Sequence, residues 1–224
     1  IERVMLITGA SSGIGAATAR RAARDGIKLV LTARRAELLE GLVAELGKAR
    51  AIAVAADATK LDEQAKVFDA AIARWEKIDV VFANAGIGVS KPGTAGGDPE
   101  EWSRVVDINV KALLWTAKLA MPHLRKTTGH FVLTSSVAGR TSHKGSIYSA
   151  TKWFAYGFGM NLAEEMAEWK GRCTTICPGM VNTPFFDQAK PTKLDASDVA
   201  EAVMYAIDAP ARANVREVFL MPTS

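Results

Sequence analysis

The chain has 224 residues, of which 49% are hydrophobic and 23% charged, which is typical of a globular protein with a sizeable core. Its net charge is +4, but the basic residues are scattered and form no run of five or more, so nucleic-acid binding is not expected. No apolar run approaches the ~20 residues that a membrane-spanning helix needs, and the amino end, which begins at Ile1, shows no signal peptide.

The first predicted unit is a strand, a glycine-rich turn and a helix. Val4–Thr8 is apolar and leads into Gly9, Gly13 and Gly15, and Ile14–Arg24 has helical composition. Glycines let the backbone turn tightly and approach a pyrophosphate, while the amino end of a helix offers free N–H groups and a positive dipole end. A lone glycine loop would indicate only a turn. Between a strand and a helix, it predicts a dinucleotide-binding site.

Strands and helices continue to alternate along the chain. Further strands are predicted at Lys28–Thr32, Ala51–Ala55, Val80–Ala83, His130–Thr134, Arg172–Cys177 and Glu217–Met221. Further helices are predicted at Ala36–Leu46, Leu61–Arg74, Glu100–Leu119, Tyr148–Ala167 and Ser197–Ile207. This alternation predicts an α/β fold: a Rossmann-like doubly wound parallel sheet of about seven strands, with helices on both faces in three α/β/α layers. Because no linker or break in composition occurs, residues 1–224 are expected to form a single domain, with ligands at the carboxyl ends of the strands.

The second predicted strand is followed by Arg34 and Arg35, about 20 residues beyond the glycine turn. Enzymes that use NAD usually carry an acidic residue here, which accepts hydrogen bonds from the ribose 2′-hydroxyl. Guanidinium groups suit a 2′-phosphate instead, because they supply charge and paired donors. The pattern therefore favours NADP(H) over NAD(H), the alternative being that both arginines belong to a solvated helix start.

Tyr148 and Lys152 lie four residues apart in a predicted helix, so their side chains share one face. A nearby ammonium group favours the phenolate and would lower the tyrosine pKa from its usual ~10 toward neutrality. A phenol of that kind is suited to general acid–base catalysis. Chance produces this pair often, so its meaning depends on the motifs that accompany it.

Six motifs occur in the order and approximate spacing of the short-chain dehydrogenase/reductase family, which the chain resembles over nearly its whole length. They are Thr8-Gly-x-x-x-Gly-Ile14-Gly15, Asn84-Ala85-Gly86, Asn109, Ser135-Ser136-Val137-Ala138-Gly139, Tyr148-x-x-x-Lys152 and Pro178-Gly179-x-x-x-Thr183. The resemblance implies an enzyme that reversibly transfers a hydride between the nicotinamide of NADP(H) and a carbonyl or secondary alcohol of a small substrate.

The resemblance also implies a role for each catalytic side chain. Tyr148 is the acid–base residue, and Lys152 lowers its pKa and bonds the nicotinamide ribose. Asn109 holds a water that links the lysine to solvent. The carbonyl-polarising serine is Ser136 by the local Ser-x-x-Gly pattern, whereas a count of thirteen residues back from the tyrosine selects Ser135.

The expected cofactor site lies in the loops that follow the strands. It comprises Gly9, Ser11, Ser12, Gly13, Ile14, Gly15, Arg34, Arg35, Asp57, Ala58, Asn84, Ala85, Gly86, Tyr148, Lys152, Pro178, Gly179, Val181 and Thr183. Two of these positions have structural alternatives: Asp57 is also placed to cap a helix, and the Asn84 turn to support the sheet.

The substrate is less well defined than the cofactor. The expected lid, Thr183–Ala196, is short, which suggests a small or open pocket, and the Pro222-Thr223 ending resembles the branch that acts on small hydroxy acids and aldehydes. The alternatives are a 3-oxoacyl-thioester reductase of the same family and a non-catalytic protein that senses NADP(H).

The family resemblance implies a homodimer or homotetramer. Cys173 and Cys177 would lie ~13 Å apart on one strand, too far for a disulfide with each other. Two free thiols fit the reducing cytoplasm, and no cluster of residues has metal-ligand spacing, so neither a metal nor a membrane or nucleic-acid partner is expected.

Overall fold

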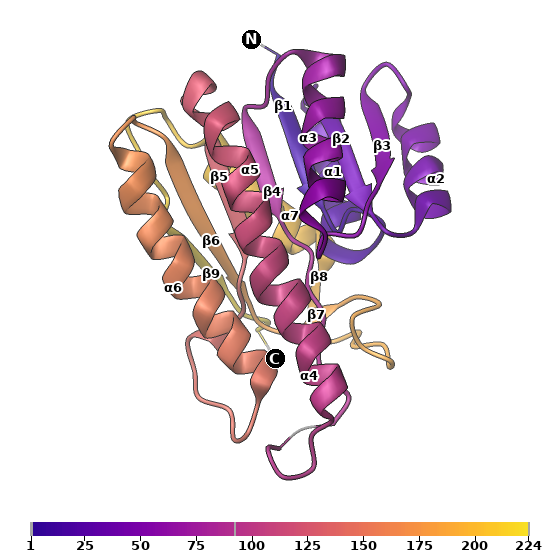
Figure 1. The fold of residues 1–224 in the computed structure, drawn as a ribbon, viewed down its shortest axis with the longest axis vertical. Coiled ribbons are helices and arrows are strands. Elements are labelled where there is room, and N and C mark those ends of the chain that lie inside the picture. The colour runs from indigo at the N-terminus through magenta and orange to yellow at the C-terminus, as the bar shows by residue number, and fades with distance from the viewer. Residues whose placement is uncertain (1, 92, 224) are drawn as a thin grey trace.

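A seven-stranded parallel sheet forms the centre of the computed structural model, which describes residues 2–91 and 93–223 (Figure 1). The strands lie in the order β3-β2-β1-β4-β5-β6-β9. Their bounds are β1 Val4–Thr8, β2 Lys28–Ala33, β3 Ala51–Ala55, β4 Val80–Ala83, β5 His130–Thr134, β6 Arg172–Pro178 and β9 Glu217–Leu220. The chain builds outward from β1 to β3 and then returns to β4 on the other side. The crevice between β1 and β4 is therefore the switch point at which such sheets bind ligands.

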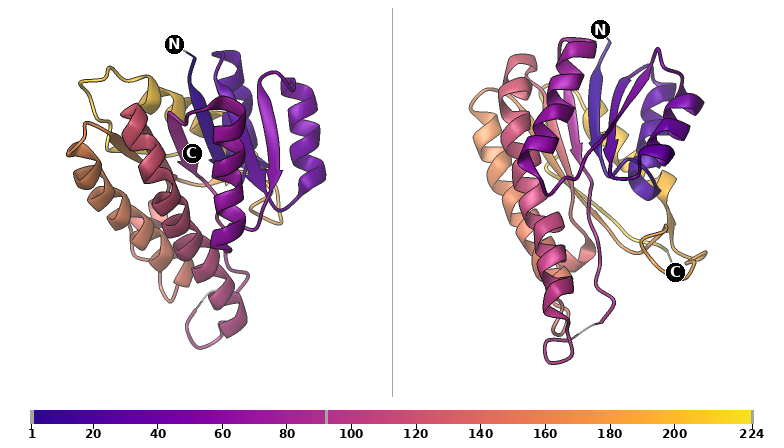
Figure 2. Two further views of the ribbon diagram at one scale, coloured as in Figure 1. Left: turned by 45° about the horizontal axis from the view of Figure 1, so that its top comes forward. Right: turned by 45° about the vertical axis from the view of Figure 1, so that its right-hand side comes forward.

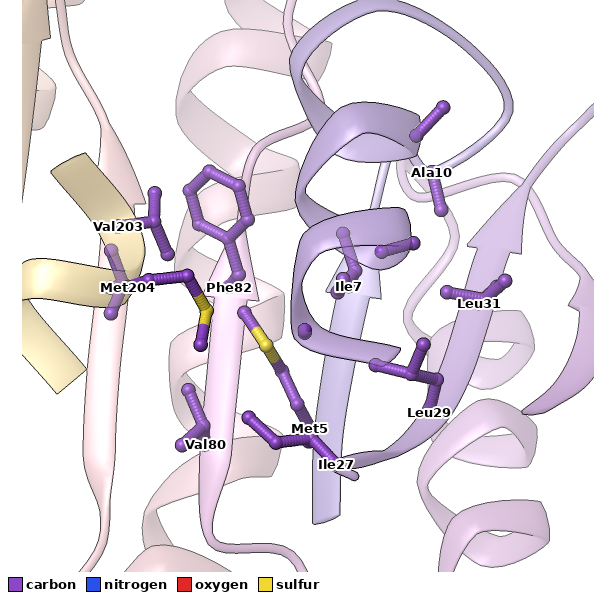
Figure 3. Packing of buried hydrophobic residues seen from close by; sticks show 14 of the residues in the cluster. Met5, Ile7, Ala10, Ile27, Leu29, Leu31, Val80, Phe82, Val203 and Met204 are labelled. Carbon is purple, nitrogen blue, oxygen red and sulfur yellow. The ribbon is translucent and has the colours of Figure 1, made fainter. Parts of the chain in front are cut away.

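Helices cover both faces of the sheet, as the right-hand view of Figure 2 shows. Residues of α1, α2 and α7 pack in one hydrophobic core, and residues of α3, α5 and α6 pack in the other. Figure 3 shows part of the first core, where Val203 and Met204 of α7 lie close to Phe82 of β4. The helices are α1 Gly13–Arg24, α2 Ala36–Leu46, α3 Leu61–Trp75, α4 Pro99–Val106, α5 Ala112–Thr127, α6 Ile147–Ala167 and α7 Ala196–Asp208.

The predicted fold class is confirmed, and the bounds of most elements agree with the structure to within two residues. The helix predicted at Glu100–Leu119 is wrong in extent, because α4 runs through a π-helical turn, Asp107–Lys111, into α5. Proline usually ends a helix, yet α5 continues past Pro122 to Thr127. Burial of Leu124 and a hydrogen bond from Thr127 Oγ1 to a backbone oxygen hold this last turn.

Two further short strands, β7 Val181–Asn182 and β8 Leu194–Asp195, pair outside the main sheet and were not predicted. They close the base of the loop that joins β6 to α7. Within the described parts of the chain, no helix combines the length and apolar character needed to cross a membrane.

Candidate active site

A cavity of about 420 Å³ opens at the carboxyl ends of the central strands. Its size is that of a typical small-molecule site. Most of the residues predicted to bind a cofactor line it: Gly9, Ser11, Ser12, Gly13, Ile14, Arg34, Arg35, Asp57, Ala58, Asn84, Ala85, Gly86, Lys152, Gly179, Val181 and Thr183. Of the others, Gly15 lies against the Gly9 carbonyl, while Tyr148 and Pro178 contact Ser136.

The glycine turn has a backbone that only glycine adopts without strain. Gly9 and Gly13 have φ angles of +65° and +53°. A Cβ atom on Gly15 would lie 2.4 Å from the Gly9 carbonyl oxygen, so a side chain has no room there. This turn brings the backbone and the amino end of α1 to the cavity, where the free N–H groups of the first helical turn can receive an anion.

Arg34 and Arg35 both line the cavity, but they have different partners. The Arg35 guanidinium donates to Ser12 Oγ at 2.7 Å and to Ser11 Oγ at 2.9 Å, which fixes it against the glycine turn. The Arg34 charge acts on Asp57, whose pKa is lowered mainly by a backbone hydrogen bond from Thr59 and further by this arginine. Two guanidinium groups thus give this end of the cavity a positive character.

The Asp57 carboxylate is held in a local turn. It accepts hydrogen bonds from the backbone N and from Oγ1 of Thr59, at 2.9 and 2.8 Å. The helix that follows begins after Lys60, and its amino end receives no side-chain cap from that residue. The capping role considered for Asp57 therefore applies to the turn before α3, not to the helix itself.

The Asn84 side chain ties three strands together at the switch point. Its Nδ2 donates to the backbone oxygens of Thr8 and Gly9, at 3.3 and 3.4 Å, and its Oδ1 accepts from Thr134 Oγ1 at 3.2 Å. These contacts are structural, as the alternative for this residue proposed. Asn84 nevertheless also lines the cavity, so support of the sheet and contact with a ligand are compatible.

The two candidate serines point to different partners. Ser135 is buried and donates from Oγ to the Lys152 carbonyl at 2.8 Å, so its hydroxyl is bound to the backbone of α6. Ser136 accepts a hydrogen bond from the backbone N of Ala138 at 3.1 Å, and its hydroxyl lies close enough to Tyr148 to lower the pKa of the phenol. The serine beside the phenol is therefore Ser136.

Burial dominates the electrostatics of the tyrosine–lysine pair. It lowers the pKa of Lys152 to about 8, and the ammonium nitrogen donates to the Thr134 carbonyl at 2.9 Å. Burial also raises the pKa of Tyr148, against a smaller opposing effect of the nearby Ser136 hydroxyl. The expected acidification of the phenol is wrong for this structure, because the Lys152 nitrogen lies 5.7 Å from the ring centre and is directed at Thr134.

Asn109 lies in the π-helical turn, which widens the helix and is common at functional positions. Its Oδ1 accepts from the backbone N of Ile87 at 2.9 Å, and its Nδ2 donates to the Ile87 carbonyl and to Thr151 Oγ1. A separate cavity of about 10 Å³, lined by Asn109 and Lys152, has room for about one water. Asparagine is a poor helix former, so Asn109 within a predicted helix was the sequence feature that indicated an irregular turn.

No role was predicted for Phe185, although its ring lies beside Tyr148. Its ring centre is 5.7 Å from that of Tyr148 and 5.2 Å from that of Phe186, and both phenylalanines line the cavity. A Cβ atom on Gly88 would come within 3.0 Å of the Phe185 ring. The aromatic pair after Thr183, inside the expected lid, was the signal that could have identified it.

The chain is similar to known proteins over nearly its whole length. Residues 3–194 match the model of the short chain dehydrogenases. The chain belongs to this family. An uncharacterized oxidoreductase of Listeria monocytogenes is 37% identical over 243 residues, which span 100% of this chain and 97% of that protein.

Solved structures of short-chain dehydrogenases share the whole fold. An alcohol dehydrogenase of the archaeon Thermococcus sibiricus, complexed with 5-hydroxy-NADP, has a TM-score of 0.92 and 29% identity, covering 100% of this chain and 97% of that one. A 3-ketoacyl-(acyl-carrier-protein) reductase of Brucella melitensis, complexed with NADH, has a TM-score of 0.92 and 28% identity, covering 99% and 97%. Serine dehydrogenase of Escherichia coli has a TM-score of 0.90 and 29% identity, covering 98% and 97%. The chain is thus an oxidoreductase of this family, as its motifs predicted.

Proposed function

We propose that this oxidoreductase uses NADP(H) to interconvert a carbonyl and a secondary alcohol on a small substrate. The observation that carries the proposal is the placement of the Ser136 hydroxyl close enough to Tyr148 to lower the pKa of the phenol, with Lys152 and Phe185, which line the cavity, next to the Tyr148 ring. A phenol and a hydroxyl that meet at one point can both bond a single substrate oxygen.

The cavity fits a nicotinamide dinucleotide. Its lining brings together the glycine turn, two arginines after β2 and Lys152, which suits a phosphate-bearing dinucleotide. A Cβ atom on Gly86 would lie 3.4 Å from Lys152 Nζ, so glycine keeps the space before the lysine open. When bound, the nicotinamide supplies or accepts the hydride.

In the proposed mechanism, the protein residues manage the substrate oxygen. Ser136 donates a hydrogen bond to it and stabilises the charge that develops there. Tyr148 gives its proton to that oxygen during reduction and removes it during oxidation. Because its pKa is raised, Tyr148 is protonated at neutral pH and ready to act as the acid. Lys152 and Asn109 border a water-sized space through which a proton can be resupplied.

Arg34 and Arg35 support the preference for NADP(H). Arg35 holds the two serines of the glycine turn, and Arg34 contributes a second positive charge to the same end of the cavity. The complex of the Thermococcus sibiricus enzyme with 5-hydroxy-NADP is consistent with this assignment, whereas the Brucella melitensis enzyme was solved with NADH. The two guanidinium groups at the end of β2 support NADP(H) as the proposed cofactor.

For the substrate we propose a small hydroxy acid, aldehyde or ketone. The Phe185 ring lies next to Tyr148 and limits the space near the reacting oxygen, and serine dehydrogenase is among the structural neighbours. A 3-oxoacyl thioester is the second candidate, supported by the likeness to the ketoacyl reductase. We also propose a homodimer or homotetramer, since Trp153 and Phe154 of α6 remain 45% and 37% exposed in the single chain.

The test is oxidation of NADPH, followed by absorbance, with a panel of small aldehydes, ketones and keto acids and one 3-oxoacyl thioester. The parent protein is expected to turn over at least one of the small carbonyls. Tyr148→Phe should still fold and bind NADPH but lose at least about 100-fold in kcat, because the proton donor is missing. Binding of NADPH without turnover of any substrate would instead identify a sensing protein.

A further inference from the structure

A chain of polar contacts runs from the Lys152 turn of α6 to the surface at β9, and the proposed mechanism does not use it. It starts at the Lys152 carbonyl, which accepts a hydrogen bond of 2.8 Å from Ser135 Oγ. The Ser135 hydroxyl in turn interacts with the thiol of Cys177, which is fully buried in β6. A Cβ atom on Gly139 would lie 2.5 Å from both the Lys152 oxygen and Ser135 Oγ, so the contact is tightly packed.

The chain of contacts continues through Glu217. This residue begins β9 and lies opposite Thr175, so its side chain shares a sheet face with Cys177 two residues further on. The Cys177 thiol has its pKa raised to about 12, mainly by burial and also by the Glu217 carboxylate, and therefore keeps its proton. A protonated thiol can donate to a carboxylate on the same face of the sheet.

The outer end of the chain returns to α6. The Glu217 carboxylate pairs with the guanidinium of Arg140. The same guanidinium lies 4.4 Å above the ring centre of Tyr156. Tyr156 is one helical turn beyond Lys152. The turn of α6 that carries the lysine is therefore held at its carbonyl by Ser135 and at its outer edge by Arg140, and Glu217 joins the two attachments.

We propose that Glu217 is a positioning residue for the proposed carbonyl reduction, fixing the Lys152 turn of α6 through Cys177, Ser135 and Arg140. One of these contacts is on the Lys152 carbonyl itself and the other is one helical turn beyond it, at Tyr156. The inference rests on the proposed function, because Lys152 matters to catalysis only if the site reduces carbonyls. It adds a strand at the far edge of the sheet to the set of elements that hold the catalytic lysine.

The chain offers a matched control for Glu217. A second ion pair, Arg216 with Glu164, also joins the start of β9 to α6, but it is exposed and lies three turns beyond Lys152. Glu217→Gln should lower kcat for carbonyl reduction about 10-fold, whereas Glu164→Gln should change it less than twofold. The Kd for NADPH should stay within about threefold in both variants, because the glycine turn and its arginines are untouched.

A second pair of variants tests the buried link. Cys177→Ser keeps a hydrogen-bond donor that can bond Glu217. Cys177→Ala introduces a side chain of nearly the same size as serine but without a donor. We expect Cys177→Ala to lower kcat as Glu217→Gln does and Cys177→Ser to restore most of it. The pH dependence of kcat should shift in Cys177→Ala and Glu217→Gln and should stay as in the parent in Cys177→Ser and Glu164→Gln. Equal kcat in Glu217→Gln and Glu164→Gln, or in the alanine and serine variants, would overturn the proposal.

A readout independent of activity separates this inference from the proposed function. Hydrogen–deuterium exchange of the backbone in residues 150–157 should be faster in Glu217→Gln and Cys177→Ala, and unchanged in Glu164→Gln and Cys177→Ser. If the parent protein reduces no carbonyl, the proposed function fails, and the exchange pattern then decides the positioning role. Unchanged exchange in all four variants would show that Glu217 does not hold this turn.

Discussion

His130 should make the stability of the fold sensitive to acid. The side chain is 1% exposed at the start of β5, its Nε2 is 2.7 Å from Thr174 Oγ1, and Nδ1 has no partner among the described residues. Burial, with smaller effects from the charges of Arg172 and Arg3, lowers the pKa of this histidine from 6.5 to about 3. The folded protein thus holds a neutral ring that the unfolded chain would protonate in mild acid.

The sign and size follow from this difference in pKa. A depressed pKa in the folded state means that the stabilisation is complete above pH 6.5 and is lost as the pH falls toward about 3. The whole difference corresponds to roughly 5 kcal/mol at 1.36 kcal/mol per pKa unit. Between pH 7.5 and pH 5.0 the free energy of unfolding should fall by about 2 kcal/mol through His130 alone.

The assay is reversible urea unfolding at pH 7.5 and pH 5.0, for the parent, for His130→Phe and for His143→Gln. The phenylalanine variant keeps a large ring in the strand and should lose about 2 kcal/mol less on acidification than the parent. His143 is exposed, so its variant should behave like the parent. Identical acid sensitivity in all three proteins would refute the reasoning, because contributions from other titrating groups cancel in the comparison.

Three further predictions concern the site. Ser136→Ala should lower kcat/KM by about 100-fold, as loss of an oxyanion donor does, and Ser135→Ala should lower it much less. If steady-state kinetics rank the two variants the other way, Ser135 is the residue that contacts the substrate carbonyl. The parent should prefer NADPH to NADH by about 10-fold or more in kcat/KM, since charge-assisted hydrogen bonds to the 2′-phosphate contribute ~1.5–3 kcal/mol each. Arg34→Asp should abolish or invert this preference, and equal use of both cofactors by the parent would contradict the prediction. Phe185→Ala should raise kcat/KM for a bulky ketone relative to a small one by roughly 10-fold, because the ring restricts space beside Tyr148; unchanged selectivity would show that the ring leaves the pocket when substrate binds.

Periodicity and turn residues were sufficient to predict the sheet, its helices and the edge at which the loops converge. Those signals are local, and the glycine turn or the strand before Ser135 needs only neighbouring residues to specify it. The extent of α5 was missed because Pro122 signals a helix end, whereas burial of Leu124 overrides it. The charge state of Tyr148 was missed for a related reason: desolvation depends on what covers the ring, and Phe185 comes from a distant loop.

The choice between Ser135 and Ser136 also needed three dimensions. Counting residues selects one or the other, but the alternation of side chains at the end of a strand directs neighbours to opposite sides. One hydroxyl therefore bonds the backbone of α6 at Lys152, and the other lies beside the side chain of Tyr148. The chain of contacts through Cys177 and Glu217 was similarly invisible, since it joins three elements whose pairing is set only by the order of strands in the sheet.

Strand β5 carries His130 at its first residue and leads into Ser135 and Ser136 just beyond its last. At about 3.3 Å per residue, these positions are separated by more than ~15 Å of rigid backbone. The residue that sets the acid sensitivity of the fold and the residues proposed to act on the substrate therefore lie at opposite ends of β5. A substitution at the first position should therefore change the acid tolerance of the fold without disturbing the two serines.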